Sequence, residues 1–273
     1  MTQTSPSVLP RSLTESSVMP EHKLSIRLAR NSDDIEAAQR LRYKVFYEEW
    51  GATPTAEMLS TRKDADPFDD VMDHLIVVDE QLGNGADSVI GTYRLLRSDV
   101  AKSFGKFYTS HEFDIAKLLN HGGNLMELGR SCVLAPYRTM AVLQLLWQGI
   151  ASYVLDHKID LMFGCACLRG TDVEAVKEQL SYLYHYHLAE ENLRVTALPD
   201  VRVKMDLVEK DSINAKDTFM KLEPLIKGYL RAGCVIGDGA YIDRQFNSID
   251  VCIILPTDRI AAKYRRHFLN SHA

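Results

Sequence analysis

Hydrophobic side chains recur along the chain first with the spacing of a strand and then with that of a helix. Residues 23–30 alternate apolar and polar side chains, a pattern typical of a half-buried strand. Asn31 or Ser32 offers the N-cap of a following helix. The apolar face of this helix is formed by Ile35, Ala38, Leu41, Val45 and Phe46. The first two elements are therefore predicted to be a strand and a helix.

A polar connection and a hairpin follow. Residues 51–67 form the connection, and a connection of this length in a compact domain is often a binding loop. Two apolar segments, 74–78 and 89–96, then flank the turn sequence Gly83-Asn84-Gly85. Glycine and asparagine adopt the backbone conformations that tight turns require, so these segments are predicted to be a β-hairpin.

The rest of the chain alternates between strands and helices. In chain order we expect a short helix at 107–119, a strand at 124–134, a strongly apolar helix at 139–155, a buried strand at 160–166, helices at 172–187 and 224–232, a glycine-rich turn at 237–239 and a strand at 250–255. Residues 241–243 are expected to pair close to the last strand. This order predicts an α/β fold, with a mixed central sheet and helices on both faces.

Composition is that of a globular protein. The chain has 273 residues, of which 46% are hydrophobic and 25% charged, enough for one large domain at 21–273. Residues 1–20 are rich in Ser, Thr and Pro and are expected to be a disordered tail rather than a signal peptide. The net charge of −5 disfavours a nucleic-acid-binding protein. No segment reaches the roughly 18 apolar residues of a membrane span, so a cytoplasmic location is expected.

The cysteines predict neither disulfides nor a metal site. They are odd in number and irregularly spaced, as expected for a reducing compartment. Cys165 and Cys167 form C-x-C rather than C-x-x-C, and no second ligand pair accompanies them. We therefore expect no metal and no cofactor.

Four charged motifs follow one another along the first half of the chain: Arg42-Tyr43-Lys44-Val45-Phe46 with Trp50, Asp66-Pro67-Phe68-Asp69, Gly91-Thr92-Tyr93-Arg94-Leu95-Leu96 and Glu127-Leu128-Gly129-Arg130. They resemble the signature of acyl-homoserine-lactone synthases, enzymes of the acetyltransferase-like (GNAT) fold that take acyl chains from acyl carrier protein (ACP). Trp50 falls closer to Phe46 than that family's pattern expects. The chain also carries a C-terminal block that those shorter enzymes lack.

Five stretches between about residues 24 and 267 point to a second family: 73–78, 127–133, 162–166, 180–185 and 224–231, that is DHLIVV, ELGRSCV, MFGCA, LSYLYH and PLIKGYLR. Through them the chain is more similar to the ornithine Nα-acyltransferases of ornithine-lipid synthesis, also called haemolysin-like acyltransferases. The resemblance implies a GNAT fold with a mostly antiparallel sheet and a C-terminal α-β extension. It also implies transfer of a 3-hydroxyacyl group from ACP to the α-amine of L-ornithine, which yields lyso-ornithine lipid.

Aminolysis of a thioester requires a neutral amine and a leaving thiolate that is protonated or tolerated. Glu127, on the predicted central strand, is the candidate general base, acting through a water. The alternative is an ion pair with Arg130 or Arg94. In a regular strand Glu127 and Arg130 would face opposite sides, and a β-bulge would change that. Tyr182 is a candidate proton donor to the thiolate, or else an ordinary core aromatic residue.

Five charged residues form the predicted acceptor-binding set. They are Arg42, Asp66, Asp69, Arg94 and Arg130. An arginine can clamp the carboxylate of a zwitterionic amino acid, and a carboxylate can hold the δ-ammonium of ornithine. The alternative is a network that fixes the N-terminal helix on the sheet.

The predicted donor-binding residues are Ser131, Val133, Arg138 and Thr139. Acetyl-CoA enzymes of this fold carry a glycine-rich turn that cradles the pyrophosphate at a helix N-terminus, whereas residues 137–141 contain no glycine. The pantetheine arm of ACP has a single phosphodiester, so a reduced cradle suits it. Arg138 and the helix amides are predicted to bind that phosphate; the alternative for Arg138 is a surface charge.

A basic run near the C-terminus is the predicted docking surface for acidic ACP. It contains Arg259, Lys263, Arg265 and Arg266. The same cations could instead contact anionic lipids at the inner membrane surface, or merely form a solvated helix. Other functions left open by the sequence are an acyl-homoserine-lactone synthase using S-adenosylmethionine, a CoA-dependent acetyltransferase, a non-catalytic acyl-binding module, and acylation of another amino acid or amine.

Overall fold

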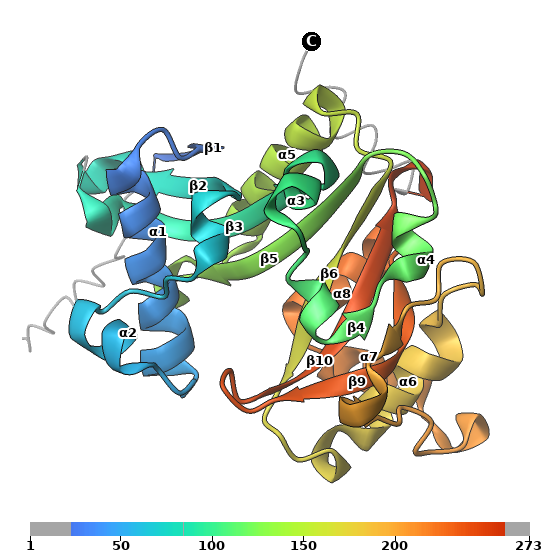
Figure 1. Ribbon diagram of the computed structural model, residues 1–273. Coiled ribbons are helices and arrows are strands. Elements are labelled where there is room, and N and C mark those ends of the chain that lie inside the picture. Colours follow the sequence, from blue (N-terminus) through green and yellow to red (C-terminus); the bar gives the residue numbers. More distant parts are fainter. Residues whose placement is uncertain (1–22, 84, 260–273) are drawn as a thin grey trace, which may run out of the picture.

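One twisted sheet runs through the computed structural model, which describes residues 23–83 and 85–259 (Figure 1). The strand order is β1-β2-β3-β5-β6-β10-β9-β7-β4, with β8 pairing to β9. The strands are β1 (Leu24–Leu28), β2 (Asp73–Asp79), β3 (Val89–Arg97), β4 (Phe113–Asp114), β5 (Leu125–Val133), β6 (Leu161–Arg169), β7 (Thr196–Ala197), β8 (Arg202–Val203), β9 (Val235–Asp243) and β10 (Ser248–Pro256). The predicted tail and three cations of the basic run, Lys263, Arg265 and Arg266, lie outside the described residues.

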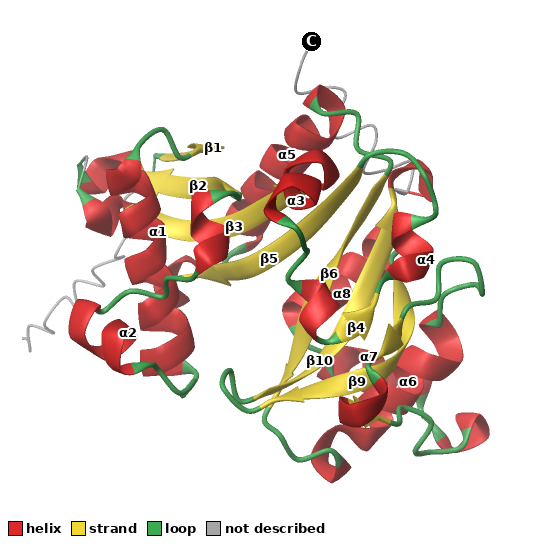
Figure 2. Cartoon of the chain, in the orientation of Figure 1, coloured by secondary structure: helices red, strands yellow, loops and turns green. Residues whose placement is uncertain are grey.

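Helices cover both faces of the sheet (Figure 2). They are α1 (Ser32–Tyr43), α2 (Ala56–Thr61), α3 (Ser98–Phe104), α4 (Ala116–Leu119), α5 (Met140–Asp156), α6 (Lys177–His187), α7 (Ala215–Lys221) and α8 (Pro224–Ala232); a π-helix, η1 (Lys44–Glu49), continues α1. No helix among the described residues is long and apolar enough to cross a membrane.

Alternate residues of each strand supply the two faces. Leu75 and Val77 of β2 belong to the core packed under α5, α6 and α8, whereas Ile76 and Val78 pack against α1. This is the period of two expected for a strand buried on both sides. The predicted mixed α/β sheet with helices on both faces is confirmed.

The central strands β5 and β6 are parallel and paired over a short length. Their register runs from Leu125↔Leu161 to Glu127↔Phe163, although both strands continue beyond it. A Cβ on Gly164 would lie 2.2 Å from the carbonyl oxygen of Leu128, so the backbones still touch one residue further on. Beyond that point β6 remains paired with β10, and β5 with β3. The sheet therefore opens between its two central strands, immediately after Glu127.

Two sequence-based predictions are wrong. The turn expected at 237–239 lies inside β9, where it forms a bulge opposite β10 between the pairs Val251↔Ala240 and Ile253↔Ile236. Gly239 has a φ of +85°, a conformation that glycine adopts without strain.

The second wrong prediction is the helix at 107–119. This segment is a 3₁₀ turn at Thr109–His111, the short strand β4 and a single helical turn, α4. The backbone amides of Tyr108 and Thr109 bond to the Glu127 carboxylate, and β4 pairs with β7. Those tertiary bonds override the local helical pattern.

Replacing Gly164 with alanine should destabilise the protein, because the added methyl group meets backbone rather than a movable side chain. We expect the free energy of unfolding to fall by about 1–3 kcal/mol in urea titrations. Gly129→Ala on β5 is the matched control, since nothing lies within 4 Å of its Cβ position. Equal stability of both variants would contradict the close contact between β5 and β6.

Candidate active site

A β-bulge in β5 brings Glu127 and Arg130 to the same face of the sheet. The register between β3 and β5 shifts between Thr92↔Cys132 and Arg94↔Gly129, and Arg130 has a φ of +49°. Tyr108 contacts both residues, because its amide bonds to Glu127 and its ring lies under the Arg130 guanidinium. The sequence left open whether this strand is regular or bulged, and the structure shows the bulge, which places a cation on the side of the carboxylate.

Glu127 lies where β5 and β6 separate, and its carboxylate is buried. Its oxygens accept the amide of Tyr108 at 2.9 Å, the amide of Thr109 at 2.6 Å and the Thr109 hydroxyl. Burial raises the pKa of Glu127, and the hydrogen bonds oppose that shift only in part. In the described chain Glu127 forms no ion pair with Arg94 or Arg130, which bond to aspartates instead.

A buried ion network joins α1 to β3. Arg42, with no exposed surface, bonds to Asp64 at 2.7 Å and to Asp69 at 2.8 Å. Arg94 bonds to Asp66 at 2.7 Å and to Asp69 at 3.0 Å. Burial alone would raise the pKa of Asp64, but the surrounding arginines lower it to about 2.

The network unites all five predicted acceptor-binding residues and adds Asp64. Sequence reasoning missed Asp64, although it belongs to the polar connection expected to be a binding loop. The network fixes α1 and this connection to the sheet, which is the structural role that the sequence analysis gave as the alternative to acceptor binding. Nη1 of Arg42 and Nε of Arg94 are nevertheless buried without a hydrogen-bond partner. Which members contact an acceptor stays a prediction.

Arg130 differs from the other arginines of the network in being partly accessible. Its side chain is 13% exposed, against 0% for Arg42 and 1% for Arg94. Its bonds to Asp64 and Asp66 are long, at 3.3 and 3.4 Å. Aromatic rings contact it, with the ring centroid of Phe246 4.3 Å from the guanidinium carbon. Arg130 is thus the arginine of the network that is best placed to meet a ligand.

The predicted donor-binding residues gather where β5 ends and α5 begins. Thr139 caps α5, because its hydroxyl accepts the amide of Val142. Arg138 forms a double hydrogen bond with Glu49 and donates to the carbonyl of Val133. Ser131 lies near Tyr93, whose pKa burial raises and Ser131 lowers. This set lies beside the open part of the sheet, and its contact with a donor stays a prediction.

Sequence reasoning missed a second cation near this end. The guanidinium of Arg169, the last residue of β6, lies 4.5 Å from the Trp50 ring centroid, and that of Arg138 lies 5.8 Å from it. Trp50 therefore connects the far ends of β5 and β6. No sequence motif marks Arg169, because it comes close to Trp50 only in the folded sheet.

Tyr182 lies on the opposite face of the sheet from Glu127. It belongs to α6 and packs in the core that contains Met126 and Leu128, the two neighbours of Glu127 along β5. Its hydroxyl is 3.2 Å from Nε2 of His187, and burial raises its pKa. The structure does not bring Tyr182 to the glutamate.

Three further acidic residues that sequence reasoning missed lie on the Glu127 face. The carboxylate oxygens of Glu112, Asp243 and Asp250 lie within 4.8 Å of one another, and all three side chains are buried. They come from the segment before β4, the end of β9 and the start of β10. Only tertiary structure unites them.

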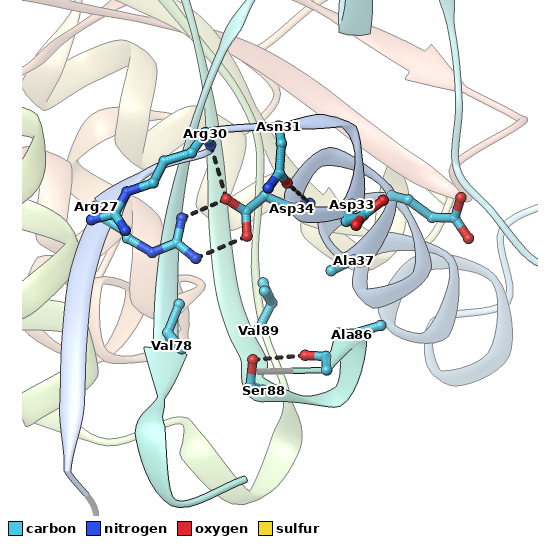
Figure 3. A pocket seen from close by; sticks show the side chains of 12 residues that line it. Arg27, Arg30, Asn31, Asp33, Asp34, Ala37, Val78, Ala86, Ser88 and Val89 are labelled. Carbon is cyan, nitrogen blue, oxygen red and sulfur yellow. Dashed lines mark hydrogen bonds and ion pairs between the residues drawn. The ribbon is translucent and has the colours of Figure 1, made fainter. Parts of the chain in front are cut away.

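A pocket of about 600 Å³ lies away from this site, between the N-terminus of α1 and the β2–β3 hairpin (Figure 3). Its most buried charge, Asp34, pairs with Arg27 at 2.6 Å and accepts the amide of Arg30. The lining residues are Arg27, Arg30, Asn31, Asp33, Asp34, Glu36, Ala37, Val78, Gly85, Ala86, Ser88 and Val89. None of them belongs to the candidate site, so the size of this pocket says nothing about acyl transfer.

Comparison with known proteins defines the class of this chain. Residues 41–148 match the family model described as the Acetyltransferase (GNAT) domain. The chain is 44% identical over 248 residues to the L-ornithine N(alpha)-acyltransferase of Agrobacterium fabrum, covering 90% of this chain and 85% of that protein. It is 43% identical over 244 residues to the enzyme of the same name from Rhodobacter capsulatus, covering 89% and 93%.

Solved structures of similar fold include acyltransferases of other substrates. A CoA-dependent acyl-homoserine lactone synthase gives a TM-score of 0.48 at 16% identity, over 92% of this chain and 89% of the other. An N-acyl amino acid synthase from uncultured soil microbes gives 0.45 at 12% identity, over 92% and 98%. The protein is an acyltransferase of the GNAT class. Its sequence relatives place it further: the chain belongs to the L-ornithine Nα-acyltransferase family.

Replacing Arg42 with methionine should strongly destabilise the protein. The change leaves Asp64 and Asp69 buried without their principal cation, which costs about 3–5 kcal/mol of unfolding free energy. Arg40→Met is the control on the same helix, because Arg40 forms an exposed pair with Glu36 worth about 0.5 kcal/mol or less. Chemical denaturation measures both, and similar losses for the two variants would refute a structural role of the network.

Proposed function

We propose that this protein moves a 3-hydroxy fatty acyl group from ACP to the α-amine of L-ornithine, forming lyso-ornithine lipid. The observation that carries the proposal is the buried carboxylate of Glu127 at the point where the central strands separate. The sequence relatives named L-ornithine N(alpha)-acyltransferase support the acceptor. The choice of ACP as the donor rests on the predicted donor-binding residues alone.

The donor's pantetheine arm would lie along the edge of β5 that β6 leaves unpaired. This arm contains amides that can bond to a strand edge as a peptide does. Its phosphodiester would then meet the N-terminus of α5 and the guanidinium of Arg138, with Arg169 as a second cation across the opening. Arg138 must exchange Glu49 for the phosphate to do so.

Glu127 would take a proton from the α-ammonium of ornithine through a water, which leaves the amine free to attack the thioester carbonyl. A raised pKa suits this role, because a base works best when its pKa approaches the working pH. Tyr182 stays a candidate for protonating the thiolate. It can meet the sulfur only if the arm passes through the opening to the α6 face.

Arg130 would bind the carboxylate of ornithine. It is the partly exposed arginine of the ion network, and it shares a face with Glu127. Asp64 and Asp66 would orient it, while Arg42, Arg94 and Asp69 hold those aspartates and the connection that carries them.

Docking of acidic ACP would require a local basic surface on this acidic chain. In the predicted basic run, Arg259 bonds to Glu190 at 3.1 Å, and the other cations lie outside the described residues. This surface, or a contact of the same cations with the inner membrane, belongs to the proposal as an expectation from the sequence.

Incubation of the purified protein with 3-hydroxyacyl-ACP and an amino acid panel tests the proposal, with N-acyl products identified by mass spectrometry. We expect Nα-acyl-ornithine, and faster turnover with acyl-ACP than with acyl-CoA at matched concentration. Equal turnover with both donors would refute the ACP assignment. Lactone formation from S-adenosylmethionine, or binding of acyl-ACP without turnover of any amine, would refute the proposed reaction.

Glu127→Gln should lower kcat by about 10²-fold or more, because it keeps the shape of the side chain and removes the base. The variant should still fold, with some loss of stability in thermal melting, because the –NH2 group of glutamine cannot accept the backbone amide that the replaced oxygen accepts. Glu191→Gln is the control, since Glu191 is exposed and pairs with Lys117 and Arg194 far from the sheet opening. A folded Glu127→Gln variant with full activity across pH would demote Glu127 to a structural residue.

A further inference from the structure

The acidic cluster of Glu112, Asp243 and Asp250 is buried, and the charge of Arg130 acts on Glu112 and Asp250 without forming an ion pair with them. Their relative exposures are 3%, 7% and 4%, and no ion pair formed by the described residues includes any of them. Asp243 accepts the amides of Gln245 and Phe246, and Asp250 accepts the hydroxyl of Ser248. Oε2 of Glu112 is buried and has no hydrogen-bond partner.

This arrangement opposes ionisation of two of the three carboxyl groups, those of Glu112 and Asp250. Burial, and then the neighbouring Asp250, raise the pKa of Glu112 to about 9, and burial raises that of Asp250 to about 6. Buried carboxyl groups that lack a cation either take up a proton, as the raised pKa of Glu112 indicates, or destabilise the fold. A cation bound among them would stabilise their charged form.

The acidic cluster is connected to both parts of the candidate active site. Cys165 interacts electrostatically with Glu112, and its sulfur lies 3.7 Å from the Thr109 hydroxyl, which itself bonds to Glu127. On the other side, Phe246 donates its amide to Asp243 and places its ring against Arg130. The cluster, the glutamate and the arginine therefore surround one region of the sheet face.

A ligand can reach the acidic cluster from β6. Cys167 stands directly opposite Asp250 in the pairing of β6 with β10, so the two side chains lie on the same face of the sheet. Cys167 is nevertheless exposed, and Cys165 is partly exposed. These residues lie on the part of β6 that has separated from β5. The acidic cluster thus adjoins the sheet opening.

We propose that the acidic cluster binds the side-chain ammonium of the acceptor and so selects a diamino acid. This inference rests on the proposed function. A primary ammonium carries three N–H donors and no acceptor, which matches three carboxylates. Ca²⁺ would require six to eight oxygen ligands, and Mg²⁺ would keep several waters, so either needs more than the cluster supplies.

Such binding also explains the choice between the two amines of ornithine. With the δ-ammonium among the carboxylates and the α-carboxylate on Arg130, the α-amine lies on the Glu127 side. The carboxylates stabilise the charged form of the δ-amine, which cannot attack a thioester. Selectivity for the α position then follows from electrostatics.

Steady-state kinetics with L-ornithine and L-norvaline test the inference, because norvaline has the same carbon chain without the δ-amine. We expect the parent enzyme to prefer ornithine in kcat/KM. In Glu112→Gln and Asp250→Asn this preference should fall by about 10- to 100-fold, mainly through KM for ornithine, as a charge-assisted hydrogen bond is lost. Glu191→Gln should keep the parent preference.

Thermal unfolding provides a second readout that does not require turnover. Ornithine should stabilise the parent protein more than norvaline does, and the difference should vanish in Glu112→Gln. The parent measurement stands even where a variant fails to fold, and Asp243→Asn gives a third variant. Unchanged preference in the folded variants would overturn the inference, as would loss of activity with a chelator and its recovery with Ca²⁺ or Mn²⁺.

The inference and the proposed function fail in different ways. If the parent acylates ornithine and norvaline equally well, the ammonium subsite is wrong and the proposed reaction stands. If the parent forms no N-acyl-ornithine from any donor, the proposed reaction is wrong.

Discussion

The parallel strands β5 and β6 share their pairing only from Leu125 to Glu127, and the candidate site is arranged around the place where that pairing stops. A continuous sheet would cover the edge of β5 and leave no room for an extended thioester arm. Gly164 allows the two backbones to touch at Leu128, one residue beyond the last paired residues. The opening is therefore fixed in position by packing, and Glu127 is fixed beside it by hydrogen bonds from Tyr108 and Thr109.

The buried ion network gives this opening a rigid wall. Charges removed from water are rarely a net gain in stability, so their value lies in holding defined positions. Arg42 and Arg94 bind the aspartates of the long connection, and those aspartates in turn contact Arg130 at the bulge. The network thereby holds the partly exposed Arg130 on the same face as Glu127, while its bonds to the aspartates keep it from pairing with that glutamate.

Sequence patterns predicted the elements whose signals are local. The apolar period of α5 and the β2–β3 hairpin depend on side chains within each segment. The segment at 107–119 was misread because the Glu127 carboxylate takes its amides, and 237–239 because β10 determines its bulge. The charged motifs of the sequence indicated the ion network. No sequence pattern indicated the acidic cluster, because its three residues come from segments that are far apart in the chain.

The position of β10 between β6 and β9 has a consequence for synthesis of the protein. The strand that completes the middle of the sheet is the last in the described chain, so it leaves the ribosome after the other strands of residues 23–259. Until then both edges of β6 beyond Phe163 lack a partner, since β5 has already diverged. Unpaired apolar strand edges are the usual starting points of aggregation during folding. The feature that opens the sheet for chemistry thus also lengthens the time for which the nascent chain is vulnerable.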